Sequence, residues 1–485
     1  MKNIAGTLLL LAIALTWEPA DTKAQSVNRS EAISVAGNYL NLRHPEQSTG
    51  MTEPLKSGSD TLAWLVNCKP HGFIIISNNT SLSPVIAWSE EGNFAEGEAW
   101  VDFLPVLMYD LKTRNEFVRQ GTDEAIANRR KWSYWMTPQE NTTNFQQWPP
   151  EGWSSTGGWL FTNWTQSSPY NALCPIDGQT QVRSIAGCPA TAMAQIVNFH
   201  HKTNTTHFSD ADDYYHNFGS GNSYWIDNDW ESRGFPSWDQ LNVYLDTLEA
   251  HYQQGVTLTK TDKAALTYAC GAAAKQVFSS SVSGTYGVDQ AFDAFKRFGY
   301  SDARLDGPLN PELNMQLAQN IMLALPAHLA LVNPEWTVGH NVVVDGYNTD
   351  ELFHFNFGWG GSANGWYTMP PTDIPYDLTV IEGIVMDINL SSPPVGTKEN
   401  AEVQDQSTMN YSNETGFLYI RLPESSKQAI LTVYDQTGRI VMQNNLYGDS
   451  EYITSGLPVK HLPKGLFIAT MVTETGSRNV CKFIR

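Results

Sequence analysis

The chain has 485 residues, of which 41% are hydrophobic and 12% aromatic, so it can bury the cores of about three domains. Its 30 Lys and Arg against 50 Asp and Glu give a net charge of −20, which argues against nucleic acid and anionic membranes as partners. Five cysteines in a chain of this length exclude a disulfide scaffold, and the odd number leaves at least one thiol unpaired. No zinc-binding spacing of Cys or His is present, so we expect no metal and no cofactor.

Residues 1–24 have the features of a signal peptide. Lys2 precedes an apolar run at residues 8–15, and small residues before the predicted cleavage point favour processing after Ala24. The run is too short to span a bilayer, and no later segment approaches ~20 apolar residues. We therefore expect a secreted or cell-surface protein with no membrane span.

Residues 25–131 are expected to form a compact α+β unit that carries no chemical motif. Apolar spacing predicts helices over 30–42 and 100–118, and strands over 61–68, 73–77 and 85–88. Residues 132–158 complete a polar, Trp-rich stretch that is typical of an exposed linker. The basic triplet at residues 129–131 is an easy target for proteolytic nicking, or equally a solvated charge cluster.

Residues 159–390 are expected to form a second α+β domain with two halves. Helical patterns come first, after residue 188 and at 264–276, 289–298 and 314–325. Strand patterns follow at 327–332, 341–347, 352–357, 365–368 and 383–388. A helical half followed by an antiparallel sheet half predicts a cleft between the two.

The remaining residues predict a linker and a small β-sandwich. Residues 391–410 are rich in Ser, Pro, Glu and Asn and have no apolar period. Residues 411–485 alternate like strands at 416–422, 429–434, 440–444, 465–472 and 479–484, with a hairpin turn at 436–439. This segment contains no catalytic constellation.

Cys188 is the candidate nucleophile. It follows a turn of small residues and opens a strong helical pattern, and a helix N-terminus favours a thiolate. The alternative is an inert core cysteine, the commonest fate of a free thiol. Cys174 is a competing candidate, but no helical pattern follows it.

His340, Asn356 and Trp359 are candidates for the rest of a thiol site. His340 opens an apolar strand and can act as base, and Asn356 lies on the next predicted strand, where its amide can orient the imidazole. Trp359 can cover that pair from water. Gln166 can add a side-chain donor to the Cys188 amide in an oxyanion hole, although each of these residues alone also has a purely structural explanation.

Four motifs resemble those of the streptopain family of papain-like cysteine peptidases, in the family's order. They are WTQSSPYN at 164–171, GCPATAMAQI at 187–196, GHNVVVDG at 339–346 and NFGWGG at 356–361. The resemblance implies a papain-like catalytic domain in which Cys188 is the nucleophile, His340 the general base and acid, and Gln166 the oxyanion donor. Phe357 stands where the family often has Trp, so the orienting role is assigned to Asn356 with Trp359 packing.

The same resemblance implies further features. Gly339 corresponds to a backbone contact to substrate, and Ser283 and Thr285 fall in a loop that contacts substrate. Residues 26 to about 130 resemble the inhibitory pro-region, which implies an intramolecular inhibitor and self-processing. The family prefers an apolar substrate residue one position N-terminal to the cleaved residue. Residues from 411 onward resemble the sorting domains of Bacteroidetes-type bacteria, which implies export machinery as a partner.

We therefore expect a secreted cysteine endopeptidase that is made as a zymogen and cleaves protein or peptide substrates. The activity should follow a bell-shaped pH profile, since Cys188 and His340 act as an ion pair. Two alternatives stay open. The first is a catalytically silent surface binding or adhesin module, whose 16 Trp and 20 Tyr would line a groove. The second is another papain-like reaction, such as transamidation.

Overall fold

The computed structural model of the chain describes residues 25–95, 100–118, 122–138, 145–372 and 378–389. It also describes C-terminal segments at 408–412, 417–421, 428–435, 439–447, 457–459, 462, 466–473 and 478–484. The predicted signal peptide, most of the predicted linker at 391–410 and most of the predicted turn at 436–439 lie outside the described residues.

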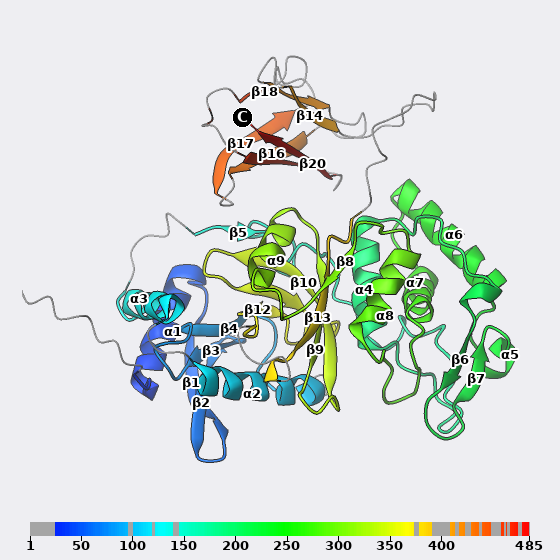
Figure 1. Cartoon of the computed structure of the whole chain (residues 1–485), viewed down its shortest axis with the longest axis horizontal. Coiled ribbons are helices and arrows are strands. Elements are labelled where there is room, and N and C mark those ends of the chain that lie inside the picture. The colour runs from blue at the N-terminus through cyan, green and yellow to red at the C-terminus, as the bar shows by residue number, and fades with distance from the viewer. Residues whose placement is uncertain are drawn as a thin grey trace, which may run out of the picture.

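The N-terminal unit is an antiparallel sheet with three helices (Figure 1). Helix α1 begins where Asn28 caps the backbone amides of Ser30 and Glu31, and it buries residues spaced three and four apart. The helices are α1 (Arg29–Arg43), α2 (Trp100–Phe117) and α3 (Asp123–Trp135). The strands are β1 (Ser48–Ser57), β2 (Asp60–Lys69), β3 (Phe73–Ser77) and β4 (Val85–Ser89).

This sheet continues into that of the second domain, because β4 pairs with β12. The strand order is β1-β2-β3-β4-β12-β11-β10-β9-β13-β8, with β5 paired to β10. The added strands are β5 (Gln147–Trp148), β8 (Arg304–Asp306), β9 (Ala327–Val332), β10 (Gly339–Asn348), β11 (Phe353–Asn356), β12 (Gly365–Tyr367) and β13 (Ile381–Met386). One sheet therefore joins the N-terminal unit to the domain that holds the candidate site.

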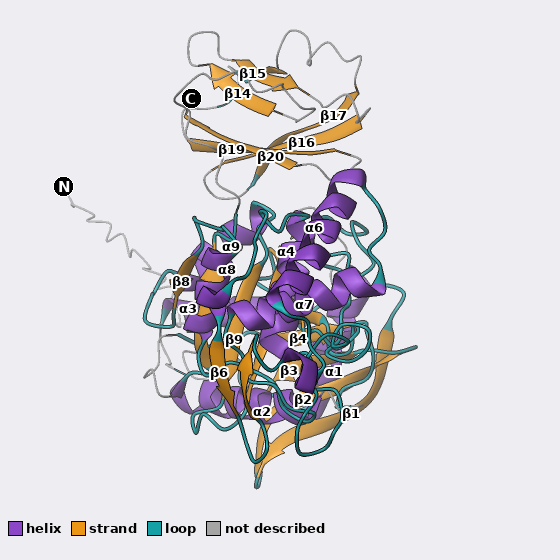
Figure 2. Ribbon diagram, turned by 90° about the vertical axis from the view of Figure 1, so that its right-hand side faces the viewer, coloured by secondary structure: helices purple, strands orange, loops and turns teal. Residues whose placement is uncertain are grey.

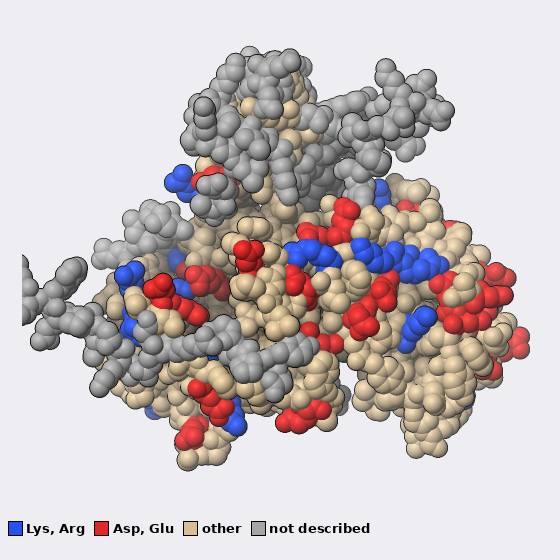
Figure 3. Space-filling model, in the orientation of Figure 1, with Lys and Arg blue, Asp and Glu red and all other residues tan. Residues whose placement is uncertain are grey.

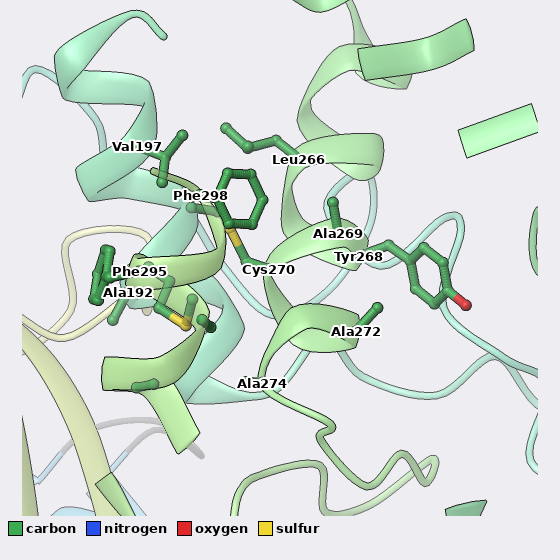
Figure 4. Packing of buried hydrophobic residues seen from close by; sticks show 14 of the residues in the cluster. Ala192, Val197, Leu266, Tyr268, Ala269, Cys270, Ala272, Ala274, Phe295 and Phe298 are labelled. Carbon is green, nitrogen blue, oxygen red and sulfur yellow. The ribbon is translucent and has the colours of Figure 1, made fainter. Parts of the chain in front are cut away.

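Helices cover both faces of the central strands. One face packs against α4 and α8, with α7 behind them, and the other packs against α2 and α9. Figure 4 shows the helical core, where Phe298 lies over Cys270 beside Val197 and Leu266. The helices are α4 (Cys188–His200), α5 (Trp230–Arg233), α6 (Trp238–Gln254), α7 (Lys260–Ala273), α8 (Val288–Arg297) and α9 (Leu313–Met322). A short 3₁₀ turn η1 (Asp210–Asp212) and the hairpin β6 (Tyr214–Asn217) and β7 (Ser223–Ile226) complete this half.

The C-terminal strands form two antiparallel sheets around a core of their own (Figure 2). One sheet has the order β14-β15-β18 and the other β17-β16-β19-β20. The strands are β14 (Thr408–Ser412), β15 (Phe417–Arg421), β16 (Gln428–Asp435), β17 (Ile440–Tyr447), β18 (Leu457–Pro458), β19 (Leu466–Thr473) and β20 (Arg478–Ile484). The predicted small β-sandwich is thus present, and the α+β class of the whole chain is confirmed.

Acidic side chains gather on one edge of the helical half, at the right of Figure 3. Burial and the neighbouring Asp213, Asp210 and Asp239 raise the pKa of Asp227 in this region. This edge therefore repels acidic ligands, as the net charge suggests. Among the helices of the described residues, none combines the length and hydropathy needed to cross a membrane.

Two predictions about the N-terminal unit were wrong. Residues 123–135 form helix α3 instead of an exposed linker, and α3 packs on α1 through Trp135 and Tyr39. The predicted boundary at residue 131 therefore cuts a helix. The basic triplet lies inside α3, where Lys131 pairs with Glu351, so it is no open nicking site. Strand β1 was also missed, because its sequence is largely polar.

Candidate active site

Cys188 is the first residue of α4 and is partly exposed. The turn before it is possible because Gly187 has φ +86°, a conformation that favours glycine. The amides of the first helical turn point out of the N-terminal end of a helix, so the position of Cys188 suits an oxyanion hole. The sequence prediction that Cys188 opens a helix is confirmed.

Both backbone polar groups of Ala186, two residues before Cys188, are hydrogen-bonded. The Ala186 N–H donates to the carbonyl oxygen of Gln166 at 2.8 Å, and the Gln276 amide donates to the Ala186 carbonyl oxygen at 2.7 Å. This contact brings Gln166 next to the start of α4, as the oxyanion-hole hypothesis requires. Gln276 was missed by sequence reasoning, because a lone glutamine carries no signal.

His340 lies near the start of β10 and is 1% exposed. Its Nε2–H donates to the carbonyl oxygen of Phe357 at 2.8 Å, and its ring lies 4.2 Å from that of Trp359. Burial lowers the pKa of His340 to about 4, so the ring is neutral near pH 7. In this tautomer the proton-accepting lone pair is on Nδ1, as a general base requires.

His340 and Cys188 are on opposite faces of the sheet. Asn341 and Val343 face α4, and Val343 belongs to the helical core. His340 stands opposite Leu331, which belongs with Val342 to the core under α2. The expectation that sulfur and imidazole meet across a groove is therefore not met in this form of the chain.

The N-terminal unit packs against Phe357, whose carbonyl oxygen accepts the hydrogen bond from His340. Phe103 of α2 lies 4.6 Å from the ring of Phe357, and Phe357 stacks at 5.1 Å on Trp359. Glu91 reaches the adjoining Gly-rich loop, where a side chain on Gly361 would meet its carboxylate. The His340 side chain thus sits in an aromatic cage that is backed by the N-terminal unit.

Asn356 does not contact His340. Its Oδ1 accepts from Gln195 of α4 at 3.2 Å and from the Gly358 N–H at 3.1 Å, and its Nδ2 donates to the Thr162 carbonyl oxygen at 2.8 Å. Asn356 therefore ties the Gly-rich loop to α4. In this form of the chain the imidazole is held instead by the Phe357 carbonyl, which no residue pattern could indicate.

The three predicted substrate contacts differ in their surroundings. Ser283 is buried, and its hydroxyl bonds to the backbone of Ser279, so the side chain is used within its own turn. Its carbonyl oxygen lies beside Gly187. Thr285 is partly exposed two residues further on, and Gly339 is exposed at the start of β10.

Two other thiols are unsuited to catalysis. Cys174 and Cys270 are fully buried, and burial raises the pKa of Cys174 to about 12 and that of Cys270 further. The rival nucleophile Cys174 would therefore be protonated and inaccessible at neutral pH.

The fold and the place of Cys188 define a class: a papain-like cysteine peptidase domain with an N-terminal unit docked on it. A family model described as the Peptidase C10 family matches residues 164–367, and one described as the Spi protease inhibitor matches residues 24–114. The chain therefore carries a Peptidase C10, or streptopain-family, domain with a Spi inhibitor domain in front of it.

The chain is similar to several named proteins. The thiol protease/hemagglutinin PrtT of Porphyromonas gingivalis is 25% identical over 75% of this chain, which spans 41% of that protein. Streptopain of Streptococcus pyogenes is 21% identical over 64% of this chain and 74% of its own length. A prointerpain A fragment of Prevotella intermedia, solved with its cysteine changed to alanine, is 21% identical with a TM-score of 0.47, over 71% of this chain and all of its own.

Proposed function

We propose that the chain is the latent precursor of a secreted cysteine endopeptidase of streptopain type. The proposal rests on the position of Cys188 at the start of α4, directly after the turn at Gly187. A partly exposed thiol stands at a helix N-terminus, and the Gln166 backbone is bonded two residues away. The match of residues 164–367 to the Peptidase C10 family supports the same reaction.

Latency follows from the side of the sheet on which His340 lies. While α2 backs the aromatic cage, the imidazole faces away from Cys188. Departure of the inhibitor domain frees Phe357 and Trp359, and the backbone at the exposed Gly339 can then turn. This rotation carries the His340 ring to the Cys188 face.

The reaction then proceeds through two acyl-transfer steps. The Cys188 thiolate attacks the peptide carbonyl, and the Gln166 amide and the Cys188 N–H hold the oxyanion. His340 protonates the leaving amine, and water hydrolyses the thioester with His340 as the base. Protein substrates with an apolar residue next to the cleaved one, on its N-terminal side, fit the family resemblance.

Residues 408–484 play no part in this chemistry. We propose that the β-sandwich takes the chain to export machinery, in keeping with the resemblance of residues from 411 onward to sorting domains. The enzyme then acts outside the cell or on its surface.

The test is self-processing and selective labelling of the full-length chain. Cys188→Ala should give a stable full-length protein that does not mature, whereas the parent chain loses its N-terminal domain. After maturation, an epoxysuccinyl probe should modify Cys188 rapidly and leave Cys270 unmodified. Normal maturation of the variant, or labelling of Cys188 as slow as that of Cys270, would instead indicate a silent binding module. Added amines appearing in the products would indicate transamidation.

A further inference from the structure

Asn341, the residue after His340, joins the candidate nucleophile to a second, buried histidine. Its Nδ2 lies 3.9 Å from the Sγ of Cys188, across the contact between β10 and α4. Its Oδ1 lies 2.7 Å from the Nε2 of His328 on the neighbouring strand β9. His328 is fully buried, and its ring meets that of Phe295 edge-on at 5.9 Å.

The chemistry of these groups fixes which way the Asn341 amide points. Burial lowers the pKa of His328 to about 4, so its ring is neutral near pH 7 and carries one N–H. The Nδ1 of His328 is buried and has no hydrogen-bond partner within the described residues. A buried N–H without a partner is rarer and costlier than a buried lone pair, so the proton belongs on Nε2. Nε2–H then donates to Oδ1, and the Asn341 NH₂ group faces the sulfur.

We propose that Asn341 donates a hydrogen bond to the Cys188 sulfur and stabilises its thiolate, with His328 as the positioning residue that holds the amide. The inference rests on the proposed function, in which Cys188 is the nucleophile. It adds a side-chain donor to the amides at the start of α4. This donor acts on the sulfur even while His340 faces the other side of the sheet.

Other titratable groups on the elements around α4 are hydrogen-bonded, buried in the core or exposed. In β10, Asp345 bonds to the His354 ring, and in α7, Asp262 bonds to His251. Cys270 is buried in the helical core. Three charged side chains of α8 are exposed to solvent, namely Asp289, Asp293 and Lys296.

The test is the pH profile of Cys188 alkylation by iodoacetamide in the full-length chain. All proteins carry His340→Ala, which prevents maturation and removes a second titrating imidazole. Asn341→Leu keeps the volume but removes the donor, and Asn341→Ala serves as a second variant. Each should raise the midpoint of the profile by about 0.5 to 1 pH unit, which slows alkylation below the midpoint about three- to tenfold. If the profiles of the Asn341 variants superimpose on that of the chain with His340→Ala alone, which is the parent in this test, Asn341 does not stabilise the thiolate.

Two matched variants test the positioning residue. His328→Phe keeps a ring but cannot donate, so it should shift the profile in the same direction as Asn341→Leu. His328→Gln keeps an N–H donor and should restore most of the parent profile. A Phe variant that behaves like the parent, or a Gln variant no better than Phe, would refute the role of His328.

Internal controls separate this test from that of the proposed function. Cys174 and Cys270 are buried and should stay unmodified in every correctly folded variant. If Cys188 of the parent reacts no faster than these two, the proposed nucleophile is wrong. If Cys188 of the parent reacts fast and the variants match it, only the inference about Asn341 is wrong.

Discussion

The ring of Phe103 on the inhibitor helix α2 lies 4.6 Å from that of Phe357, whose carbonyl oxygen accepts the Nε2–H of His340. One aromatic residue thus connects the inhibitor domain to the proposed base. Because Phe357 also stacks on Trp359, docking of α2 holds both aromatic rings in place beside the His340 imidazole. In the latency that we propose, the inhibitor domain acts from the face of the sheet opposite Cys188 and does not need to occupy the cleft.

Phe103→Ala should weaken this connection and accelerate self-processing. Removing a buried phenylalanine costs about 3–5 kcal/mol, and part of this loss falls on docking of α2. We expect maturation of the full-length chain to become at least about tenfold faster, as followed by the disappearance of the precursor on gels. Val101→Ala on the same helix is the control, since Val101 is 70% exposed. Equal rates for the parent and Phe103→Ala would contradict the cage as the cause of latency.

Gly187→Ala should abolish most activity without unfolding the domain. The substitution forces a side chain into φ +86°, and the new Cβ would lie 2.8 Å from the Gln276 amide nitrogen and from the Ser283 carbonyl oxygen. Since the Cys188 amide follows directly, we expect kcat to fall about 100-fold or more, in line with loss of an oxyanion donor. Gly219→Ala is the matched control, because Gly219 has φ +76° and open space around it. Equal activities of the two variants would show that crowding at Gly187 is unimportant.

Glu91→Gln should delay maturation at neutral pH. Burial, with a smaller contribution from Glu90, raises the pKa of Glu91 to about 7 in the docked chain, although His354 opposes this rise. The docked form therefore binds more protons than the released form between pH 4.5 and 7. The free energy that the raised pKa of Glu91 contributes to docking is fully present below pH 4.5 and is lost as the pH rises through 7.

The glutamine variant keeps a neutral side chain at every pH, so its inhibitor domain should stay docked longer at pH 7.5. We expect precursor processing at that pH to slow about three-fold or more, with little difference from the parent near pH 5. Glu53→Gln on β1 is the control, since Glu53 is exposed. A difference that is equal at both pH values would point to a cause other than ionisation.

His340 should make the latent chain sensitive to acid. Burial lowers its pKa to about 4 from an ordinary value of 6.5, so the unfolded chain binds more protons than the folded chain between these values. The stability that the neutral, caged ring contributes is present above pH 6.5 and is lost as the pH falls towards 4. Melting temperatures of full-length Cys188→Ala between pH 8 and pH 4 should therefore fall more steeply than those of the same chain with His340→Phe. Parallel curves would show that His340 is not buried in the latent form.

Most helices and strands around the site could be predicted from the sequence, because their apolar spacing is regular. The helix after Gly187 and the strands between residues 327 and 388 are present within a few residues of the expected bounds. Helix α3 was missed because it is polar overall. Its buried residues Ala125, Asn128, Trp132 and Trp135 nevertheless recur every three or four positions, so a signal was present.

The side of the sheet occupied by His340 could not be predicted. Val342, Val343 and Val344 are all buried, since helices cover both faces of β10, and the alternation that would assign the faces is absent. The orienting group could not be predicted either. In the form with the inhibitor domain docked it is a backbone carbonyl, and Asn356, which has the expected side chain, bonds to Gln195.

The pairing of β4 with β12 has a consequence for the matured enzyme. Cleavage of the chain does not break the backbone hydrogen bonds between β4 and β12 at Trp366 and Tyr367. The cleaved inhibitor domain must therefore still dissociate from β12. Its departure leaves β12 as a bare strand edge, with amide and carbonyl groups open to other chains. If the inhibitor domain is released as we propose, its docking also keeps the β12 edge covered, and so protected from edge-to-edge association, until that step.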